Sequence, residues 1–553
     1  MFFLKKLLLN RQGNEGLPEQ VLNLRLVYGI VVYGFMGAVR GLDEGLIGTT
    51  TTLPSCSNQF KLEDPSLSAD AQANRLSNIT SMVQLGSIAG SLVAFFLTDR
   101  IRRVWAVREL VVIWMIGITI YLAAAANGSL GMVIAGRFIA GIGIGRTTVV
   151  GPTYLAEIAP GAFRGLAVSV FAGMVYFGTM LAYFAAWGSS LHVSNESQLQ
   201  WILPNLLHVY FAALILIGSF WSIESPRWLV KVGNIHQAGQ NLAKIRNLSV
   251  DHEFVTAEMK DISDQLQREA EATKSTGFLA RLKEFVVPAP NRYRLMLSIL
   301  TQLLSQWSGA SSITIYAPRY FAMIGTSGTE GRLLATAVLG AVKLSTAIIC
   351  AIFLIDWIGR KRSMLGGITL QSIALLYVAL FLRISGSADK SPRSQSPSTK
   401  RAATGAVVMI YLSGVGWAAG WNTMQYLMSA ETYPLQLRAL GSSVAIVLHF
   451  ANQFGNSKAV PSMFIGLTIA GTMFFFAAVS ALGLLWVWFF VPELAGMSLE
   501  SVDAVFELPW YVIGRKGHRL VRDLEDRETI ERIADAKGDT VTIEHTEKRE
   551  EAE

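Results

Sequence analysis

The sequence predicts an all-α membrane protein with twelve transmembrane helices in two halves of six. The chain has 553 residues, of which 52% are hydrophobic and only 16% are charged. Soluble proteins carry about 25% charged residues, so this chain is too apolar for that class. Twelve stretches have close to the roughly 20 apolar residues that a helix needs to cross a bilayer.

The twelve expected spans divide evenly about a long polar stretch. They cover residues 24–49, 79–98, 108–126, 129–150, 165–187, 202–222, 295–317, 333–355, 364–382, 404–428, 439–461 and 467–491. We therefore expect an N-terminal segment (1–23), a first half (24–222), a linker (223–294), a second half (295–491) and a tail (492–553). Helical spacing around 235–246 and 251–272 predicts amphipathic surface helices within the linker.

The distribution of basic residues places both termini in the cytoplasm. The segments before the first span, after the second and after the eighth are rich in Lys and Arg, whereas the loop after the fifth has none. Cytoplasmic loops carry this excess of basic residues. The basic loop 387–401 conflicts with this orientation, because it falls outside. Late loops weigh less in setting topology, so the assignment stands.

The composition and motifs exclude several other function classes. The net charge is +7, and no basic stripe with aromatic residues indicates a nucleic-acid partner. Cys56 lies in a polar loop and Cys350 in an apolar span, so a disulfide is not expected, and no Cys or His cluster indicates a metal. The absence of a Gly-x-Ser-x-Gly motif, a P-loop and a soluble catalytic domain argues against an enzyme.

The most specific signal is the stretch from Gly136 to Gly165. It contains Gly136-Arg137, the spaced glycines Gly141, Gly143 and Gly145, Pro152-x-Tyr-Leu-Ala-Glu157, and Arg164-Gly165. Small residues of this kind let helices approach closely in a membrane. The pattern resembles the fourth-helix signature of the sugar porters, a branch of the major facilitator superfamily. The resemblance covers about residues 24–505 and implies the major facilitator fold and transport by alternating access.

Charged motifs recur at corresponding places in the two halves and resemble the cytoplasmic signatures of this family. Arg102 departs from the pattern, because it stands where the first copy should have glycine, and Leu494 replaces a threonine near the end of the second half. We expect a cytoplasmic gate of Asp99, Arg100, Arg103, Glu157, Arg164, Glu224, Arg227, Asp356, Arg360, Glu431, Arg438 and Glu493. These groups pair across the halves while the protein is open outward. Exposed ion pairs contribute only about 0–1 kcal/mol each, so such a gate breaks readily. The alternative is simple anchoring of basic residues inside.

The resemblance also implies proton coupling through Asp43 and Arg137. Asp43 matches an aspartate that, in proton-coupled members, pairs with the fourth-helix arginine, here Arg137. Pairing and unpairing of these side chains then couples the proton to the substrate. The proton is the coupling ion, and no other cofactor is expected. A purely structural ion pair is the alternative.

The expected substrate residues depart from the usual sugar-binding set. The family pattern Gln-Gln-x-Ser-Gly-x-Asn corresponds here to residues 305–311, so that Gln306 remains while Ser305 and Ser311 replace two amides. Ala172 stands where the fifth helix usually has glutamine, and Tyr426 stands in place of a tryptophan. Asn422 and Gln425 are candidate replacement contacts.

Two cations in apolar spans point to an anionic substrate. Arg40 lies three residues before Asp43, and Lys343 lies within the eighth span, near the position of a sugar-binding asparagine. A charged side chain inside the membrane needs a partner, and a carboxylate pairs well with arginine. The alternatives for Arg40 are an ion pair with Glu44 and an extended side chain that reaches the membrane interface.

We therefore expect a monomeric, multi-pass transporter in the plasma membrane that moves a monosaccharide or a sugar acid. A uronate such as galacturonate is the favoured substrate, and proton symport is the expected mechanism. A neutral hexose or pentose transporter is the alternative. A transporter-like nutrient sensor is a further alternative, although such receptors usually have a much longer cytoplasmic tail.

Overall fold

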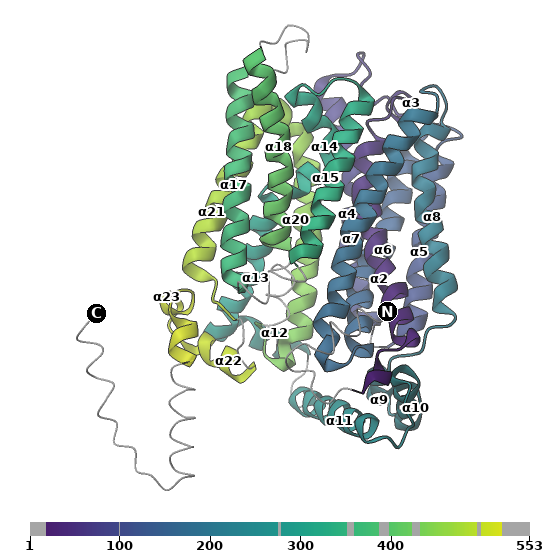
Figure 1. Cartoon of the computed structure of the whole chain (residues 1–553), viewed down its shortest axis with the longest axis vertical. Helices are drawn as coiled ribbons and strands as arrows, with labels where there is room; N and C mark the ends of the chain where they lie inside the picture. Colours follow the sequence, from purple (N-terminus) through teal and green to yellow (C-terminus); the bar gives the residue numbers. More distant parts are fainter. Residues whose placement is uncertain are drawn as a thin grey trace, which may run out of the picture.

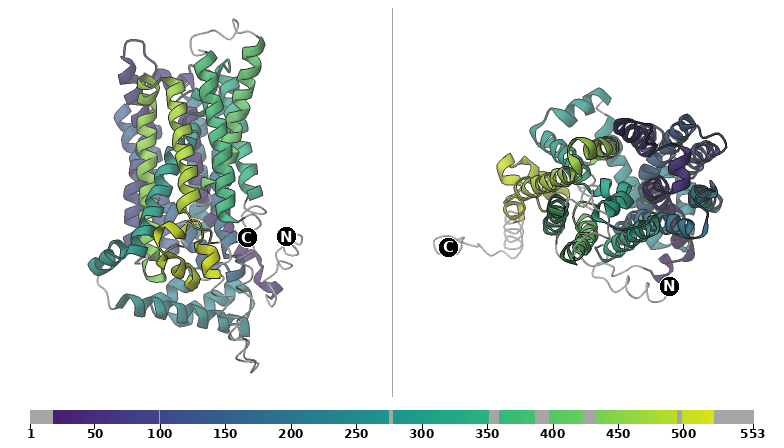
Figure 2. Two further views of the ribbon diagram at one scale, coloured as in Figure 1. Left: turned by 90° about the vertical axis from the view of Figure 1, so that its left-hand side faces the viewer. Right: turned by 90° about the horizontal axis from the view of Figure 1, so that it is seen from above.

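The computed structural model describes residues 18–98, 100–274, 278–350, 359–385, 397–422, 432–494 and 499–522. Within these residues every regular element is a helix, and ten helices are long and apolar enough to cross a membrane. The predicted all-α membrane fold is therefore confirmed. The long helices stand in two groups, one from each half of the chain (Figure 1), and the view from above shows these groups facing each other (Figure 2).

Six long helices form the first half of the chain. They are α2 (Leu24–Thr50), α4 (Ala69–Leu97), α5 (Arg103–Ala123), α6 (Leu130–Ile158), α7 (Arg164–His192) and α8 (Leu199–Ser219). The short elements η1 (Glu19–Val21), α3 (Pro54–Gln59) and η2 (Gly161–Phe163) lie between or before them. Polar side chains cap the N-termini of several helices. Before α2, Oδ1 of Asn23 accepts the backbone N–H of Arg25 at 2.9 Å.

The second half repeats this arrangement with one interrupted helix. Its long elements are α13 (Ala289–Trp307), α14 (Ala310–Ile324), α15 (Thr329–Ile349), α17 (Arg360–Ser385), α18 (Pro397–Ala419), α20 (Leu435–Gly466) and α21 (Thr468–Phe490). The linker contributes α9 (Pro226–Lys231), α10 (Ile235–Arg246), α11 (Glu253–Lys274) and α12 (Phe278–Val286). These linker helices gather at one end of the bundle, near α22 (Leu499–Glu507) and α23 (Trp510–Ile513) (Figure 1).

Several helix ends differ from the sequence expectation. The second helix begins at Ala69 rather than at residue 79, because Ser68 caps a polar first turn that the apolar pattern does not detect. The expected span 295–317 is divided at Gly309, which has φ +88° and separates α13 from α14. A Cβ at this position would also lie 2.7 Å from the Phe476 ring, so both backbone and packing require glycine. Residues 351–355 and 423–428 of two expected spans lie outside the described residues.

Glycines allow the closest helix contacts of the first half. A Cβ on Gly37 would lie 2.2 Å from the carbonyl oxygen of Phe171, and one on Gly41 would lie 1.8 Å from that of Val175. Both contacts join α2 to α7 at four-residue spacing, as in other close membrane helix pairs. Gly141 and Gly145 of α6 pack against α4, whereas Gly143 faces Trp114 of α5. The three glycines of the signature therefore serve contacts with two different helices, α4 and α5.

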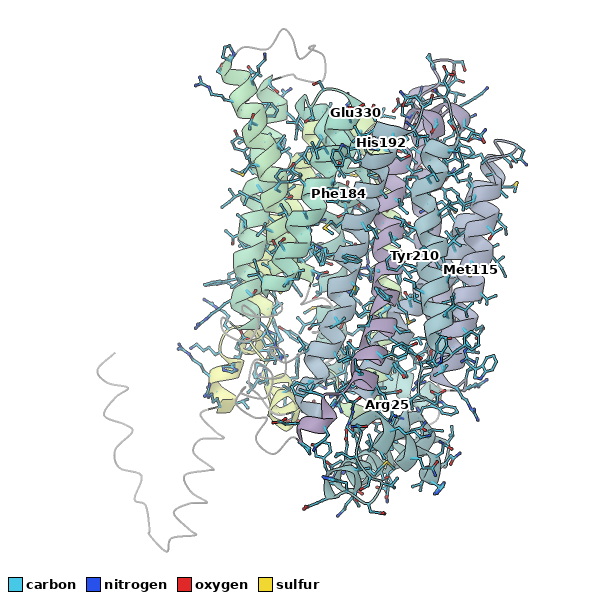
Figure 3. The ribbon with its side chains drawn as sticks, turned by 45° about the vertical axis from the view of Figure 1, so that its right-hand side comes forward. Arg25, Met115, Phe184, His192, Tyr210 and Glu330 are labelled. Carbon is cyan, nitrogen blue, oxygen red and sulfur yellow. The ribbon has the colours of Figure 1, made fainter. Side chains whose placement is uncertain are left out.

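The outer surface of the bundle is apolar at mid-height. Met115, Phe184 and Tyr210 are directed outward there, between Arg25 at the linker end and His192 and Glu330 at the opposite end (Figure 3). Tyr210 is 58% exposed, and Ile116 and Leu482 are exposed to a similar extent. Contiguous exposed apolar side chains of this extent are costly in water, so this belt is the surface that faces lipid.

We predict that Gly37→Ala destabilises the protein, because its Cβ collides with backbone atoms of α7 that cannot yield without moving the helix. Overpacking of this kind costs about 1–3 kcal/mol, which should lower the thermal unfolding midpoint in detergent. Gly173→Ala is the matched control, since no heavy atom lies within 4 Å of its added Cβ. Equal midpoints for the two variants would contradict this account of the α2–α7 contact.

Candidate functional site

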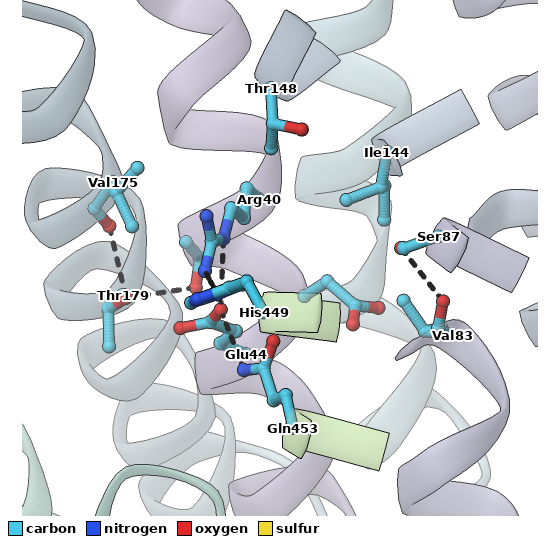
Figure 4. Close-up of polar contacts among 12 residues, drawn as sticks. Arg40, Glu44, Val83, Ser87, Ile144, Thr148, Val175, Thr179, His449 and Gln453 are labelled. Carbon is cyan, nitrogen blue, oxygen red and sulfur yellow. Dashed lines mark hydrogen bonds and ion pairs between the residues drawn. The ribbon is translucent and has the colours of Figure 1, made fainter. Parts of the chain in front are cut away.

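A cluster of polar side chains joins α2 of the first half to α20 of the second. The guanidinium of Arg40 donates from Nε to Oε1 of Glu44 at 3.1 Å, and its Nη2 lies 2.6 Å from Nε2 of His449 (Figure 4). Gln453 donates to the same Glu44 oxygen at 3.0 Å. The Arg40–Glu44 pair was one of the alternatives considered from the sequence, and the structure contains it.

The contact with Arg40 requires His449 to be neutral. An arginine side chain has only donors, so Nε2 of His449 must supply a lone pair to Nη2 of Arg40. The other ring nitrogen, Nδ1, lies 3.2 Å from Oε1 of Gln302 and 3.1 Å from Nε2 of Gln306. Gln302 and Gln306 belong to the last turns of α13, before the break at Gly309. The imidazole therefore connects Arg40 to the interrupted helix.

Lys343 lies buried in α15 on the other side of this break. Its ammonium donates to Oγ1 of Thr314, one turn into α14, and the residue is only 2% exposed. Thr314 in turn accepts at its carbonyl oxygen from the hydroxyl of Tyr183 at 2.6 Å. Among the residues that the structure describes, no carboxylate lies within ion-pair distance of Lys343. Within the described part of the chain, the hydrogen-bond partner of this buried ammonium is therefore a neutral hydroxyl.

Asp43 and Arg137 form a separate and more deeply buried pair. Two oxygen–nitrogen contacts of 3.2 Å join them, and each side chain is 2% exposed. Arg137 also donates from Nε to the carbonyl oxygen of Ile79 at 2.7 Å, and its guanidinium lies 5.8 Å from the centre of the Tyr121 ring. The sequence expectation that these two residues meet thus agrees with the geometry, and their role in proton coupling stays a prediction.

The charges of these five residues do not balance. Arg40, Arg137 and Lys343 are positive, and Asp43 and Glu44 are negative. Each arginine has its own carboxylate, so the excess positive charge falls on Lys343. A charge without a counterion in an apolar interior is costly. This group of residues therefore carries one unit of positive charge in excess.

The other expected substrate residues differ in their surroundings. Gln306 is buried beside His449, and its carbonyl oxygen accepts from Asn456 at 3.1 Å. Ser311 follows the helix break and is 8% exposed, and its hydroxyl has no hydrogen-bond partner in the described part of the chain. Asn422 is half-buried. Gln425 and Tyr426 lie outside the described residues.

The two halves also meet at the end of the bundle opposite the linker. The hydroxyls of Thr80 and Tyr316 lie 2.7 Å apart, and Lys458 donates to Ser77 at 3.1 Å and to Asn78. A Cβ on Gly48 would lie 1.6 Å from the carbonyl oxygen of Ile315. These contacts join α2 and α4 to α14 and α20 above the polar cluster, so access from this end requires the halves to separate.

At the linker end, the described gate residues form one ion pair within the first half and one within the linker. Arg103 and Glu157 form an ion pair of 2.8 Å between α5 and α6, and Arg227 pairs with Glu269 of the linker at 2.6 Å. Arg100 and Arg164 are exposed, and Arg438 donates to the carbonyl oxygen of Tyr433 at 3.5 Å. Asp99, Asp356 and Glu431 lie outside the described residues. Pairing of the gate residues across the halves therefore stays a prediction.

Glu224 and Glu493 occupy equivalent places in the two halves. Glu224 accepts the N–H of Arg103 at 2.9 Å at the start of α5, and Glu493 accepts the N–H groups of Arg360 and Lys361 at the start of α17. Carboxylates at a helix N-terminus are stabilised by the free N–H groups and the helix dipole. Burial raises the pKa of Glu224, and the backbone N–H groups that it accepts oppose this rise.

Arg102 stands where the first copy of the charged motif should have glycine, and the backbone geometry of the two copies explains this difference. Gly359 has φ +87°, and a Cβ there would lie 3.1 Å from Oε2 of Glu493. Arg102, its counterpart before α5, has φ −55° and ψ 141°, which any residue adopts. The first copy of the motif therefore has no need of glycine.

Sequence reasoning missed the partners that hold the two cations. His449, Gln453, Gln302 and Thr314 were not among the expected site residues, although each contacts Arg40, Glu44, His449 or Lys343. The available signal was the presence of His449 and Gln453, four residues apart, in an otherwise apolar span. Polar residues at this spacing share one face of a helix.

Comparison with known proteins extends these observations. The sequence profile of the family described as "Sugar (and other) transporter" matches residues 29–506. A quinate permease of Neurospora terricola is 30% identical over 495 residues, which cover 89% of this chain and 90% of the relative. A probable quinate permease of Aspergillus terreus is 30% identical over 539 residues, which cover 96% of this chain and 97% of the relative.

Solved structures with the same fold include the xylose transporter XylE from E. coli. Its partially occluded inward-open conformation superposes with a TM-score of 0.70 at 20% identity, covering 86% of this chain and all of that chain. A structure of the proton:xylose symporter XylE bound to 6-bromo-6-deoxy-D-glucose gives a TM-score of 0.70 at 21% identity. At this level of identity the likeness establishes the fold.

We predict that Glu157→Ala or Arg360→Ala slows initial uptake while leaving the protein at the membrane. Glu157 holds the buried guanidinium of Arg103, and a hydrogen bond to a charged group contributes about 1.5–3 kcal/mol, so a loss of about tenfold is expected for Glu157→Ala. Glu196→Ala, on the exposed loop after α7, is the control for loss of a carboxylate. Unchanged initial rates in both gate variants at equal surface expression would remove the gate from the account.

Proposed function

This chain belongs to the sugar and other transporter family, and we propose that it carries a polyhydroxylated monocarboxylate together with protons across the plasma membrane. The substrate class includes quinate and uronates such as galacturonate, which share a ring, several hydroxyls and one carboxylate. The proposed route is alternating access, in which the two halves separate first on one side of the polar cluster and then on the other.

The observation that supports an anionic substrate is the state of Lys343. Lys343 is 2% exposed and its ammonium is bonded to the hydroxyl of Thr314, and no described carboxylate lies within ion-pair distance of it. One substrate carboxylate placed beside Lys343 would balance the single excess positive charge of the cluster. A neutral sugar would leave this charge uncompensated, so the ammonium discriminates between an acid and a sugar of the same shape.

The loss of amide side chains supports the same substrate class. Ser305, Ser311 and Ala172 stand where the resemblance to the sugar porters implies glutamine or asparagine that bind sugar hydroxyls. Gln306 remains, and Ser311 has a buried hydroxyl without a partner in the described part of the chain. The quinate permeases described above are similar to this chain over nearly its full length, which makes quinate the first acid to test and galacturonate the second.

Proton coupling through Asp43 and Arg137 completes the proposal. The pair lies one residue from Glu44 and in the same helix as Arg40, so its opening or closing moves the helix that carries the polar cluster. Protonation of Asp43 would weaken its attraction to Arg137. Transport of one monoanion with one proton is electroneutral, and transport with more than one proton carries positive charge inward.

A neutral hexose or pentose is the second candidate substrate, and the Arg40–Glu44 pair favours it. Because Glu44 already neutralises Arg40 at 3.1 Å, this arginine alone does not require an anion. The two candidates therefore differ mainly in the role of Lys343. A sensing role without transport is tested by the same uptake experiments in a host that lacks transporters of its own.

We predict that Lys343→Gln lowers the apparent affinity for quinate or galacturonate by about tenfold or more, since a charge-assisted contact contributes about 1.5–3 kcal/mol. Arg40→Gln should also weaken uptake of the acid. Both changes should affect uptake of a neutral hexose much less. Competition of labelled uptake by each compound measures these effects.

Arg319→Gln is the matched control for loss of a cation, because Arg319 pairs with Glu63 at an exposed site. If wild-type uptake is competed fully by glucose or xylose and is untouched by quinate and galacturonate, the anionic substrate is wrong.

We also predict that Asp43→Asn abolishes accumulation of substrate against a gradient, because the neutral side chain cannot release a proton. Exchange of internal for external substrate should continue, since that process needs no net proton movement. Accumulation in vesicles with an imposed pH gradient measures the first effect and counterflow measures the second. Persistent uphill uptake that collapses with a protonophore would assign the coupling proton to another residue.

A further inference from the structure

His449 is a titratable group in direct contact with a candidate substrate cation. Its Nε2 accepts from Nη2 of Arg40 at 2.6 Å, and the residue is 2% exposed. The Arg40 guanidinium also lies 5.3 Å from the centre of the neighbouring Phe450 ring. Two basic side chains at this distance are compatible only while the imidazole is neutral, because imidazolium has no lone pair to offer.

Protonation of the imidazole reverses this contact. Two cations would then face each other across a hydrogen-bond distance in a weakly polar interior, where like charges repel strongly. Arg40 has an alternative partner in Glu44 and flexible torsions that allow it to turn away. Gln302 can still accept from Nδ1 of the ring at 3.2 Å, so the charged imidazole keeps one partner on α13.

We propose that His449 binds a proton during transport and thereby releases Arg40 to bind the carboxylate of the substrate. This inference rests on the proposed anionic substrate. In the empty protein, neutral His449 and Glu44 hold Arg40 between the halves. On loading, a proton from the outer solution adds to Nε2 of His449. One oxygen of the substrate carboxylate takes the place of the ring nitrogen at Nη2 of Arg40, and the other oxygen faces the Lys343 ammonium.

The charges balance at the cluster itself. The proton on His449 adds one positive charge and the substrate adds one negative charge, so the cluster carries the same net charge when loaded and when empty. The proton proposed for Asp43 is a second one and carries one positive charge inward in each cycle. After the halves open to the cytoplasm, the anion leaves, the proton leaves Nε2 and Arg40 returns to the imidazole. Proton and anion favour each other's binding by the same factor, as linkage requires.

The charged and titratable groups around His449 are few in the described part of the chain. Arg40, Asp43 and Glu44 lie on α2, where they face α20 and α6. On the other elements that pack against α20, charged residues lie toward the helix ends, at Asp70 and Arg75 of α4, Arg292 and Arg294 of α13, Arg319 of α14, and Arg438 and Lys458 of α20 itself; α21 has none. Glu269 of α11 lies at the linker end. Among the described charges, Arg40 contacts this imidazole directly and Glu44 contacts Arg40.

The test is the pH dependence of substrate binding to the purified, full-length protein. Quinate and galacturonate are the acids used, and xylose and glucose the neutral sugars. For the wild type, affinity for the acid should rise as the pH falls from neutral toward about 5, where the acid is still mostly ionised because its carboxyl group titrates around 3–4. In His449→Gln, whose amide oxygen can accept from Arg40 but cannot take a proton, this rise should be lost. In Asp43→Asn it should remain.

Proton uptake on binding supplies a second measurement that needs no variant. Addition of acid to weakly buffered wild-type protein should withdraw protons from solution. No proton uptake by the wild type, or an unchanged pH dependence in His449→Gln, overturns the role of His449. If neither acid binds at any pH while xylose or glucose binds, the proposed anionic substrate has failed instead.

Discussion

The cost of a charge buried without a counterion governs the arrangement of this protein. Charged side chains occur within several of its membrane helices, and those described in the core almost all have specific partners. Arg137 has Asp43, Arg146 has Glu109 at 2.9 Å and Arg40 has Glu44. Lys343 differs, because its described partner is the neutral hydroxyl of Thr314. The proposal of an anionic substrate follows from this one exception, and Thr314 lies in the first turns of the helix that follows the break at Gly309.

The same constraint explains how the two halves repeat each other. Glu224 and Glu493 each cap the first turn of a helix in their own half, where the free N–H groups supply the charge compensation. Gly359 is needed only in the second copy, where its backbone takes a positive φ beside Glu493. The repeat therefore conserves an electrostatic contact rather than an identical set of residues.

Much of the fold could be predicted from the sequence, because apolar length and the placement of basic residues determine how a chain sits in a bilayer. The meeting of Asp43 with Arg137 was also predictable, since the motif that carries each residue is specific. The helix start at Ala69 was not, because a polar turn capped by Ser68 has no apolar signal. The contact of His449 with Arg40 joins residues 409 positions apart in the chain, and no local pattern indicates such a pair.

The most direct test of the account is the position of a bound carboxylate. A cryo-electron microscopy structure of the protein with quinate, or with galacturonate if quinate does not bind, would locate that group relative to Lys343. The account predicts that the carboxylate lies within hydrogen-bond distance of the Lys343 ammonium, between α15 and the break at Gly309. A bound acid whose carboxylate faces away from Lys343, with the ammonium still bonded only to Thr314, would contradict it.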